Sequence, residues 1–131
     1  MANKPDLDAE GVEQISSAAL ENAHQIATAQ AILYGFDGRN TDGTNPAFIM
    51  VFDKASAAVS GTDIPKIVIN VASSNNFAYS AASSSGIKFK SGIYILGSST
   101  DFNGSTFTIL ASNKLFFHVE FAMEDGLTNP A

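Results

Sequence analysis

The chain has 131 residues, a formal net charge of −6, 15% charged residues and no cysteine, and it is long enough for one domain with a hydrophobic core. The acidic balance argues against binding to nucleic acid, which needs clustered Lys and Arg, and against binding to an anionic membrane surface. The absence of cysteine excludes a disulfide framework and thiolate chemistry, and no apolar run approaches the ~18 residues of a membrane span.

The first 22 residues form an acidic segment that we expect to be separate from the rest of the domain. Its acids, opposed only by Lys4, are Asp6, Asp8, Glu10, Glu13 and Glu21. Val12, Ile15 and Ala19 recur at helical spacing, with Asp6 or Asp8 as an N-cap. The sequence therefore predicts either a short helix or an extended arm lying on a partner over residues 1–22, followed by one domain over residues 23–131.

Six to eight strands are predicted after this segment, because short alternating or apolar runs are separated by turn signals about every 10 residues. The predicted strands are 24–28, 31–36, 47–52, 64–72, 86–99, 106–110 and 115–123. The stretches Asp37 to Pro46, 54–63 and Ser73 to Ser85 are predicted to be turns or loops. This spacing is typical of an antiparallel β-sandwich or a small, jelly-roll-like barrel.

The strand GIKFKSGIYILGSS, residues 86–99, changes character after Gly92. One face is apolar throughout, whereas the opposite face changes from Lys88 and Lys90 to Tyr94 and Leu96. A glycine inside a strand often marks a bulge or bend. The apolar outer face is expected to be covered by a second layer of the same domain or by another subunit.

Side chains that could carry chemistry are few, and none forms a catalytic motif. The loop DGRNTDG fails the EF-hand pattern at its first and twelfth positions, although Asp37, Asn40 and Asp42 could form a looser ion site. His24 and His118 have no metal-ligand spacing and are expected to be surface or interface histidines. We therefore predict no enzyme, no catalytic, cofactor-binding or metal residues, and no cofactor.

Phe77 and Tyr79 are two aromatic residues within the Ser-rich stretch Ser73 to Ser85. They could form a sugar-binding platform. Aromatic residues in such a position also anchor a loop to its own domain or insert into a neighbouring subunit. All three roles remain open from the sequence.

Five pieces of the sequence, in this order, resemble a family of small structural proteins of tailed-bacteriophage virions. They are AILYGFDGRN (Ala31 to Asn40), AFIMVFDKA (Ala47 to Ala55), TDIPKIVINV (Thr62 to Val71), GIKFKSGIY (Gly86 to Tyr94) and GSST (Gly97 to Thr100). The resemblance covers roughly residues 23 to 121. It implies a β-sandwich module of the phage particle, with no catalytic residues to transfer.

The expected function is therefore that of a virion structural protein, namely a capsid decoration (cement) protein on the outer shell. A neck, tail or fibre component and a carbohydrate-binding module are the alternatives. The expected partners are the major capsid protein or other virion proteins and further copies of the chain, for example in a trimer. Because no signal peptide is evident, we expect synthesis in the host cytoplasm before incorporation into the virion. The candidate interface residues are Phe77, Tyr79, Tyr94, Leu96, Phe116 and His118.

Overall fold

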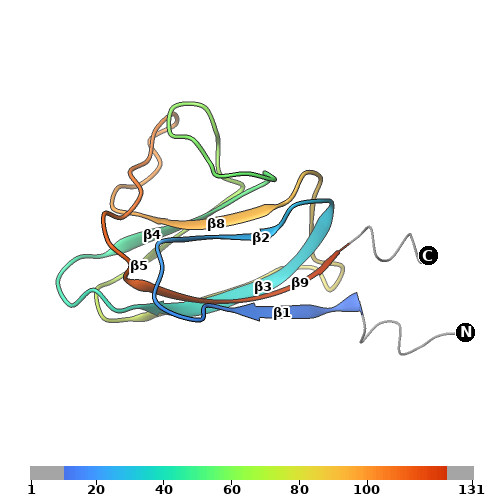
Figure 1. Cartoon of the computed structure of the whole chain (residues 1–131), viewed down its shortest axis with the longest axis horizontal. Coiled ribbons are helices and arrows are strands. Elements are labelled where there is room, and N and C mark those ends of the chain that lie inside the picture. The colour runs from blue at the N-terminus through green and yellow to red at the C-terminus, as the bar shows by residue number, and fades with distance from the viewer. Residues whose placement is uncertain (1–10, 124–131) are drawn as a thin grey trace, which may run out of the picture.

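Two antiparallel sheets packed face to face make up the computed structural model, which describes residues 11–123 (Figure 1). Sheet A has the order β1 (Glu13–Ser16), β9 (Leu115–Met123), β3 (Ala31–Asn40) and β6 (Asn76–Ser80), and β7 (Ile87–Phe89) pairs with the start of β3. Sheet B has the order β2 (Ala23–Ala27), β8 (Ile93–Ser98), β4 (Ala47–Phe52) and β5 (Ile67–Val71). The prediction of an antiparallel β-sandwich is confirmed.

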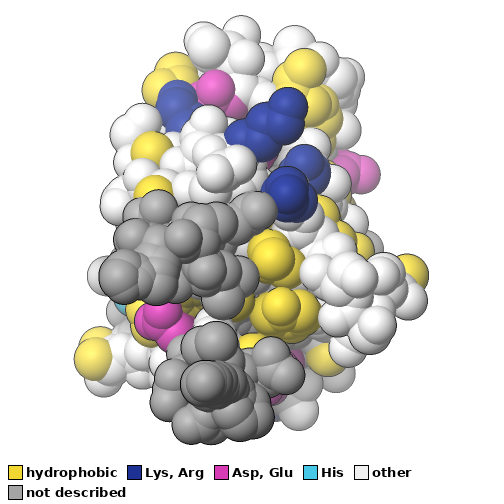
Figure 2. Space-filling view, turned by 90° about the vertical axis from the view of Figure 1, so that its right-hand side faces the viewer, with side chains coloured by type: hydrophobic (Ala, Val, Ile, Leu, Met, Phe, Trp, Pro, Cys, Tyr) yellow, Lys and Arg dark blue, Asp and Glu magenta, His cyan; other side chains and the backbone are white. Residues whose placement is uncertain are grey.

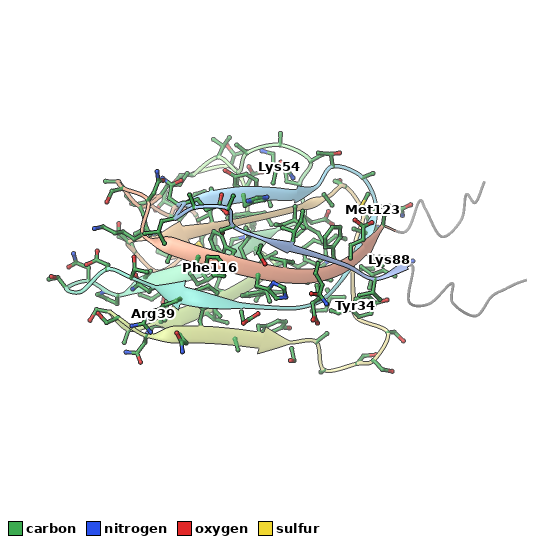
Figure 3. All side chains as sticks on the ribbon, turned by 60° about the horizontal axis from the view of Figure 1, so that its bottom comes forward. Tyr34, Arg39, Lys54, Lys88, Phe116 and Met123 are labelled. Atoms are coloured by element: carbon green, nitrogen blue, oxygen red, sulfur yellow. The ribbon has the colours of Figure 1, made fainter. Side chains whose placement is uncertain are left out.

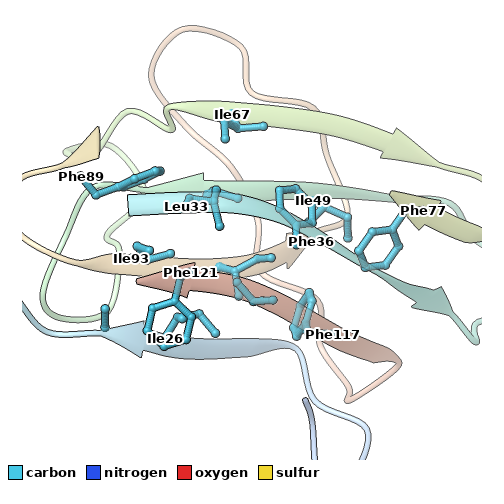
Figure 4. Packing of buried hydrophobic residues seen from close by; sticks show 14 of the residues in the cluster. Ile26, Leu33, Phe36, Ile49, Ile67, Phe77, Phe89, Ile93, Phe117 and Phe121 are labelled. Atoms are coloured by element: carbon cyan, nitrogen blue, oxygen red, sulfur yellow. The ribbon is translucent and has the colours of Figure 1, made fainter. Parts of the chain in front are cut away.

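The main core lies between the two sheets and is built from the inward faces of their strands (Figure 4). In β9 the buried and the solvent-facing side chains alternate, as the sequence predicts: Phe117 and Val119 are buried, whereas Phe116 and Glu120 are exposed. β4 lies between β8 and β5, which confirms it as a central strand. Four consecutive residues of β4 from Ile49 are buried, because its outer face is covered as well.

The change of character after Gly92 arises because the predicted strand is two strands in different sheets. β7 belongs to sheet A and β8 to sheet B, so the chain crosses the sandwich between them. A Cβ atom at Gly92 would lie 2.5 Å from the carbonyl oxygen of Ala27 and 2.8 Å from that of Lys54. A glycine is therefore needed at the crossing, since two other segments approach its backbone closely.

Two loops of the same chain cover the outer face of sheet B and form a lobe, which projects at the top of Figure 1. Leu96 lies beneath this lobe in a second apolar cluster with Met50, Phe52, Ala58 and Phe107. The loops are residues 53–66 and 99–114. They are joined by hydrogen bonds from the Gly61 N–H to the Ser105 carbonyl, 3.0 Å, and from the Phe107 N–H to Ser60 Oγ, 3.0 Å. The apolar face of β8 is thus covered by the domain's own layer.

Other predicted elements also differ from the structure in the described residues. The helix predicted in the first 22 residues is wrong for Glu13–Ser16, which forms β1 and pairs with β9 of its own sheet. Asp6 and Asp8, its predicted caps, lie outside the described residues. The turn predicted from Asp37 begins too early, because β3 continues to Asn40. The strand predicted over 106–110 is only an isolated bridge between Ile109 and Ser98.

The stretch Ser73 to Ser85 is also not the continuous loop that its composition predicts. Residues Asn76–Ser80 form β6, which pairs with β3 at the edge of sheet A. The burial of Phe77 and the partial burial of Tyr79 explain the difference, since both rings pack against the core from this strand. Tertiary packing has overridden the low strand propensity of the Ser and Asn residues around them.

Candidate functional site

The outward face of sheet A is the candidate docking surface. The inner side of sheet A packs on the core, whereas Asn76, Phe116 and Gln14 on its other side are exposed. We call this outward surface the open face. Its side chains come from β6, β3, β9 and β1 and are Asn76, Ala78, Ser80, Asp37, Arg39, Phe116, His118, Glu120, Gln14 and Ser16.

The strand registers align these side chains in three rows across the sheet. The first row runs Asn76, Arg39, Phe116, the second runs Ala78, Asp37, His118, Ser16, and the third runs Ser80, Gly35, Glu120, Gln14. Cross-strand neighbours on one face of a sheet lie about 5 Å apart. The open face therefore carries one apolar ring, charged side chains of both signs and short polar groups, and its Phe and Arg are residue types enriched at protein interfaces.

Two hydrogen bonds hold side chains of the open face in place. Arg39 Nη1 donates to Asn76 Oδ1 at 3.0 Å, which draws the guanidinium along its row. Ser16 Oγ and His118 Nδ1 lie 2.7 Å apart across β1 and β9. Figure 3 shows Arg39 and Phe116 near each other on sheet A, with Tyr34, Lys88 and Met123 toward its other end.

Two adjoining depressions hollow the open face between β6 and its neighbours. One, of about 470 Å³, is lined by residues that include Arg39, Asn76 and Phe116. The other, of about 300 Å³, is lined by residues that include Gly35 and Glu120. Both share Asp37 and Ala78. At Gly35 a Cβ atom would lie 2.7 Å from the Tyr79 carbonyl oxygen. A larger residue would not fit there, so no side chain fills this depression from β3 at that position.

In the loop that could have formed an ion site, the side-chain oxygens accept hydrogen bonds from the loop's own backbone N–H groups. Asn40 is buried, and its side chain donates to the carbonyls of Asn45 and Ala72 while accepting from the Asp42 N–H. Asp42 Oδ1 accepts from the N–H groups of Thr44 and Asn45, which lower the pKa of its carboxyl group. Asp37 lies on the open face instead. Asn40 and Asp42 therefore stabilise a turn, and the three residues do not converge on one point.

The two histidines lie on different sheets. His24 Nδ1 lies 2.8 Å from Glu21 Oε2, a local contact at the start of β2. His118 lies in the second row of the open face. Within residues 11–123, no group of three or more His, Cys, Asp or Glu side chains is placed to hold a metal ion. In the same residues, no helix has the length and apolarity of a membrane span.

The six candidate interface residues divide into three groups. Phe116 and His118 lie on the open face, as an interface requires. Phe77 and Leu96 are buried in the two apolar clusters, so neither presents a surface to a partner. Tyr79 stacks on Phe36, with ring centroids 5.4 Å apart and packed against the core. Tyr94 is half-buried against the lobe cluster, and burial raises the pKa of its hydroxyl group.

Sequence reasoning missed the polar members of the open face, above all Arg39 and Asn76. Both fall in stretches predicted to be turns, so no face could be assigned to them. The signal that was present is the alternation in NFAYS (Asn76–Ser80), where two aromatic residues are separated by a single small one.

A second surface, at the end of the sandwich where β4 ends and β5 begins, carries Lys54, Lys66 and Lys90 near Lys88 of β7. Figure 2 looks at this end and shows Lys and Arg side chains gathered beside hydrophobic ones. Lys54 pairs with Asp63, and the carboxylate of Asp53 accepts hydrogen bonds from the N–H groups of Lys90 and Ser91 at the same end. This end is therefore not uniformly basic.

Comparison of the chain with known protein families, with curated proteins and with solved structures finds no match.

Proposed function

We propose that this chain is a structural protein of a tailed-bacteriophage virion, and most specifically a capsid decoration protein that binds the outer shell and stabilises contacts between capsomers. The observation that carries the proposal is the open face. One face of the sandwich is covered by the domain's own lobe, while the opposite face presents Phe116 among short polar groups and charged side chains.

The composition of the open face supports protein–protein docking. Phe116 is 38% exposed although it belongs to a regular central strand, and burying the rest of such a ring under a partner is favourable. Arg39 is held by Asn76, so it loses little side-chain freedom when a partner covers it. Aromatic and Arg side chains are those most often found at the energetic centre of an interface.

A component of the neck, tail or a fibre is the second candidate, since the same resemblance supports it. The number of copies separates the two. Symmetry predicts on the order of hundreds of copies per particle for a decoration protein and about a dozen for a neck or tail protein. Quantitative mass spectrometry of purified particles measures this number. The glycan platform of Phe77 and Tyr79 is not proposed, because Phe77 is buried and Tyr79 is stacked on Phe36.

Binding to particles that lack the protein tests the proposal. Phe116→Ser should weaken binding of the purified chain at least about tenfold, the loss expected for one central aromatic anchor. Val68→Ser is the matched control, because Val68 is also 38% exposed but lies on β5 of sheet B. If both variants bind as well as the unmodified chain, the open face is not the docking surface. If the chain is absent from purified virions, the virion role is wrong.

A further inference from the structure

The outer edges of the two sheets differ in how well they are protected against pairing with another strand. In the described residues the edge strands are β1 and β6 with β7 in sheet A, and β2 and β5 in sheet B. An edge strand exposes backbone N–H and C=O groups, and proteins oppose unwanted pairing with lysines, bulges and interrupted edges.

Two of these edges carry such devices. The β6 edge is interrupted, because β3 pairs with β6 along Gly35 to Arg39 and with the separate strand β7 along Ala31 to Leu33. β2 has a register shift between Gln25 and Ala27, where Gln25 Nε2 donates to three backbone carbonyls. β5 has no such device, since it pairs with β4 in one continuous register and the ammonium of Lys66, the residue before it, lies over the Phe89 ring.

β1 carries none of these devices. It pairs with β9 in one continuous register, and it holds no lysine or proline. Ser17 N–H, directly after the strand, donates to the Phe117 carbonyl at 2.9 Å. Because the direction of backbone groups alternates along an antiparallel strand, the N–H and C=O groups of Gln14 and Ser16 point away from β9. No described strand pairs with them.

Two exposed apolar side chains flank this edge. Val12 precedes β1 and is 43% exposed, and Leu20 follows it and is 44% exposed. They are two of the seven large hydrophobic side chains exposed in the described residues. A regular edge with apolar flanks is the arrangement that favours strand addition, with backbone hydrogen bonds and flanking side chains both contributing.

We propose that two copies of this chain associate through their β1 strands, antiparallel and around a two-fold axis at Ile15. Gln14 of one copy then lies opposite Ser16 of the other, so both outward N–H groups and both outward C=O groups of each strand are paired. The two Ile15 side chains meet on the core side of the seam. Glu13 lies opposite Ser17, which keeps the two Glu13 carboxylates apart.

The resulting dimer has one continuous sheet in which the two open faces are neighbours. Two-fold, self-complementary association is the commonest symmetry of soluble oligomers. The inference stands independently of the virion proposal, because it concerns the purified chain alone. A virion role would benefit, since two linked docking faces bind with avidity.

Proline substitutions on the outward positions test this dimer in the full-length chain. Gln14→Pro and Ser16→Pro each remove an N–H group that faces the second copy and leave the N–H groups that face β9. Either should raise the dimer dissociation constant at least tenfold in analytical ultracentrifugation. Ala78→Pro is the matched control: the Asn40 N–H donates to the Asn75 carbonyl, so by alternation the Ala78 N–H faces the free edge of β6. It should leave the dimer unchanged.

Cysteine cross-linking tests the register, because the chain has no cysteine of its own. Ile15→Cys should form a covalent dimer on oxidation, because the two residues 15 lie directly opposite each other. Gln14→Cys should not, because each residue 14 lies opposite residue 16 of the other copy. The proposal would be overturned if the unmodified chain stays monomeric across a 100-fold range of protein concentration. It would also be overturned by a dimer that none of the β1 prolines weakens, or by one that cross-links at residue 14 and not at residue 15.

Discussion

Leu96 provides the sharpest test of how the apolar face of β8 is covered. Its side chain is 0% exposed beneath the lobe, in contact with the cluster that contains Met50, Phe52 and Phe107. Leu96→Ala removes this side chain from a packed site that is enclosed by a sheet on one side and by two loops on the other. Such substitutions cost the transfer free energy of the lost atoms and the energy of the cavity they leave.

The expected loss in the free energy of unfolding is about 2–5 kcal/mol. The lobe consists of loops that can partly collapse into the space, so we expect a value near the middle, about 3 kcal/mol. With a urea dependence of roughly 2 kcal/mol/M for a domain of this size, the midpoint of unfolding should fall by about 1.5 M. Circular dichroism and fluorescence should report the same transition if unfolding is two-state.

Ile64→Ala is the control for this measurement. Ile64 is also a large aliphatic residue but is 71% exposed on the lobe, so its replacement should change the free energy of unfolding by no more than about 0.5 kcal/mol. If Leu96→Ala unfolds at the same urea concentration as the unmodified chain, Leu96 is not enclosed by its own domain. The assignment of the second apolar cluster would then be wrong.

Three further predictions follow from other parts of the fold. Phe107→Ala removes a ring whose centroid lies 5.2 Å from that of Phe52. The loss of this contact should increase the rate at which limited proteolysis cleaves residues 53–66. An unchanged cleavage rate would mean that the two loops stay packed without the Phe107 ring. Urea unfolding should show that Gly86→Ala destabilises the domain by at least about 1 kcal/mol more than Gly104→Ala. Both glycines have a positive φ, but of the two only Gly86 has close neighbours, since its new Cβ atom would lie 2.5 Å from Ile32 Cγ2. Burial raises the pKa of Asp53, but backbone hydrogen bonds from Ser91 and Lys90 outweigh this effect and leave the pKa below its ordinary value. The stability that the Asp53 carboxylate provides is therefore present above about pH 4 and is lost as the pH falls further. Asp53→Asn should flatten the decline in the urea midpoint below about pH 4, and an unaltered decline would contradict this role.

Strands with strong apolar alternation could be predicted from the sequence, because burial on one face of a sheet fixes that pattern. Residues 47–52 and 115–123 are examples, and the structure confirms both. β1 and β6 could not be predicted, because they are short edge strands whose inward residues are few. Ile15 and Phe77 enter the core only because β9 and β3 are already in place to pair with them.

The candidate surface was predictable only in part. Phe116 and His118 were expected at an interface because they alternate with buried residues on a strong strand. Leu96 follows the same rule in sequence, yet the lobe covers it, and no local pattern shows that two loops far apart in the chain will pack together. The rows of the open face depend on the registers among four strands, which are set by tertiary packing rather than by any one segment.

A reconstruction of the intact virion at side-chain resolution is the measurement that tests the central claim most directly, namely that this chain acts by docking the open face of sheet A onto other virion proteins. The account predicts density for the sandwich on the particle, with Phe116 and Arg39 buried against a neighbouring protein. A particle without this chain, or one in which the open face points into solvent, would contradict it.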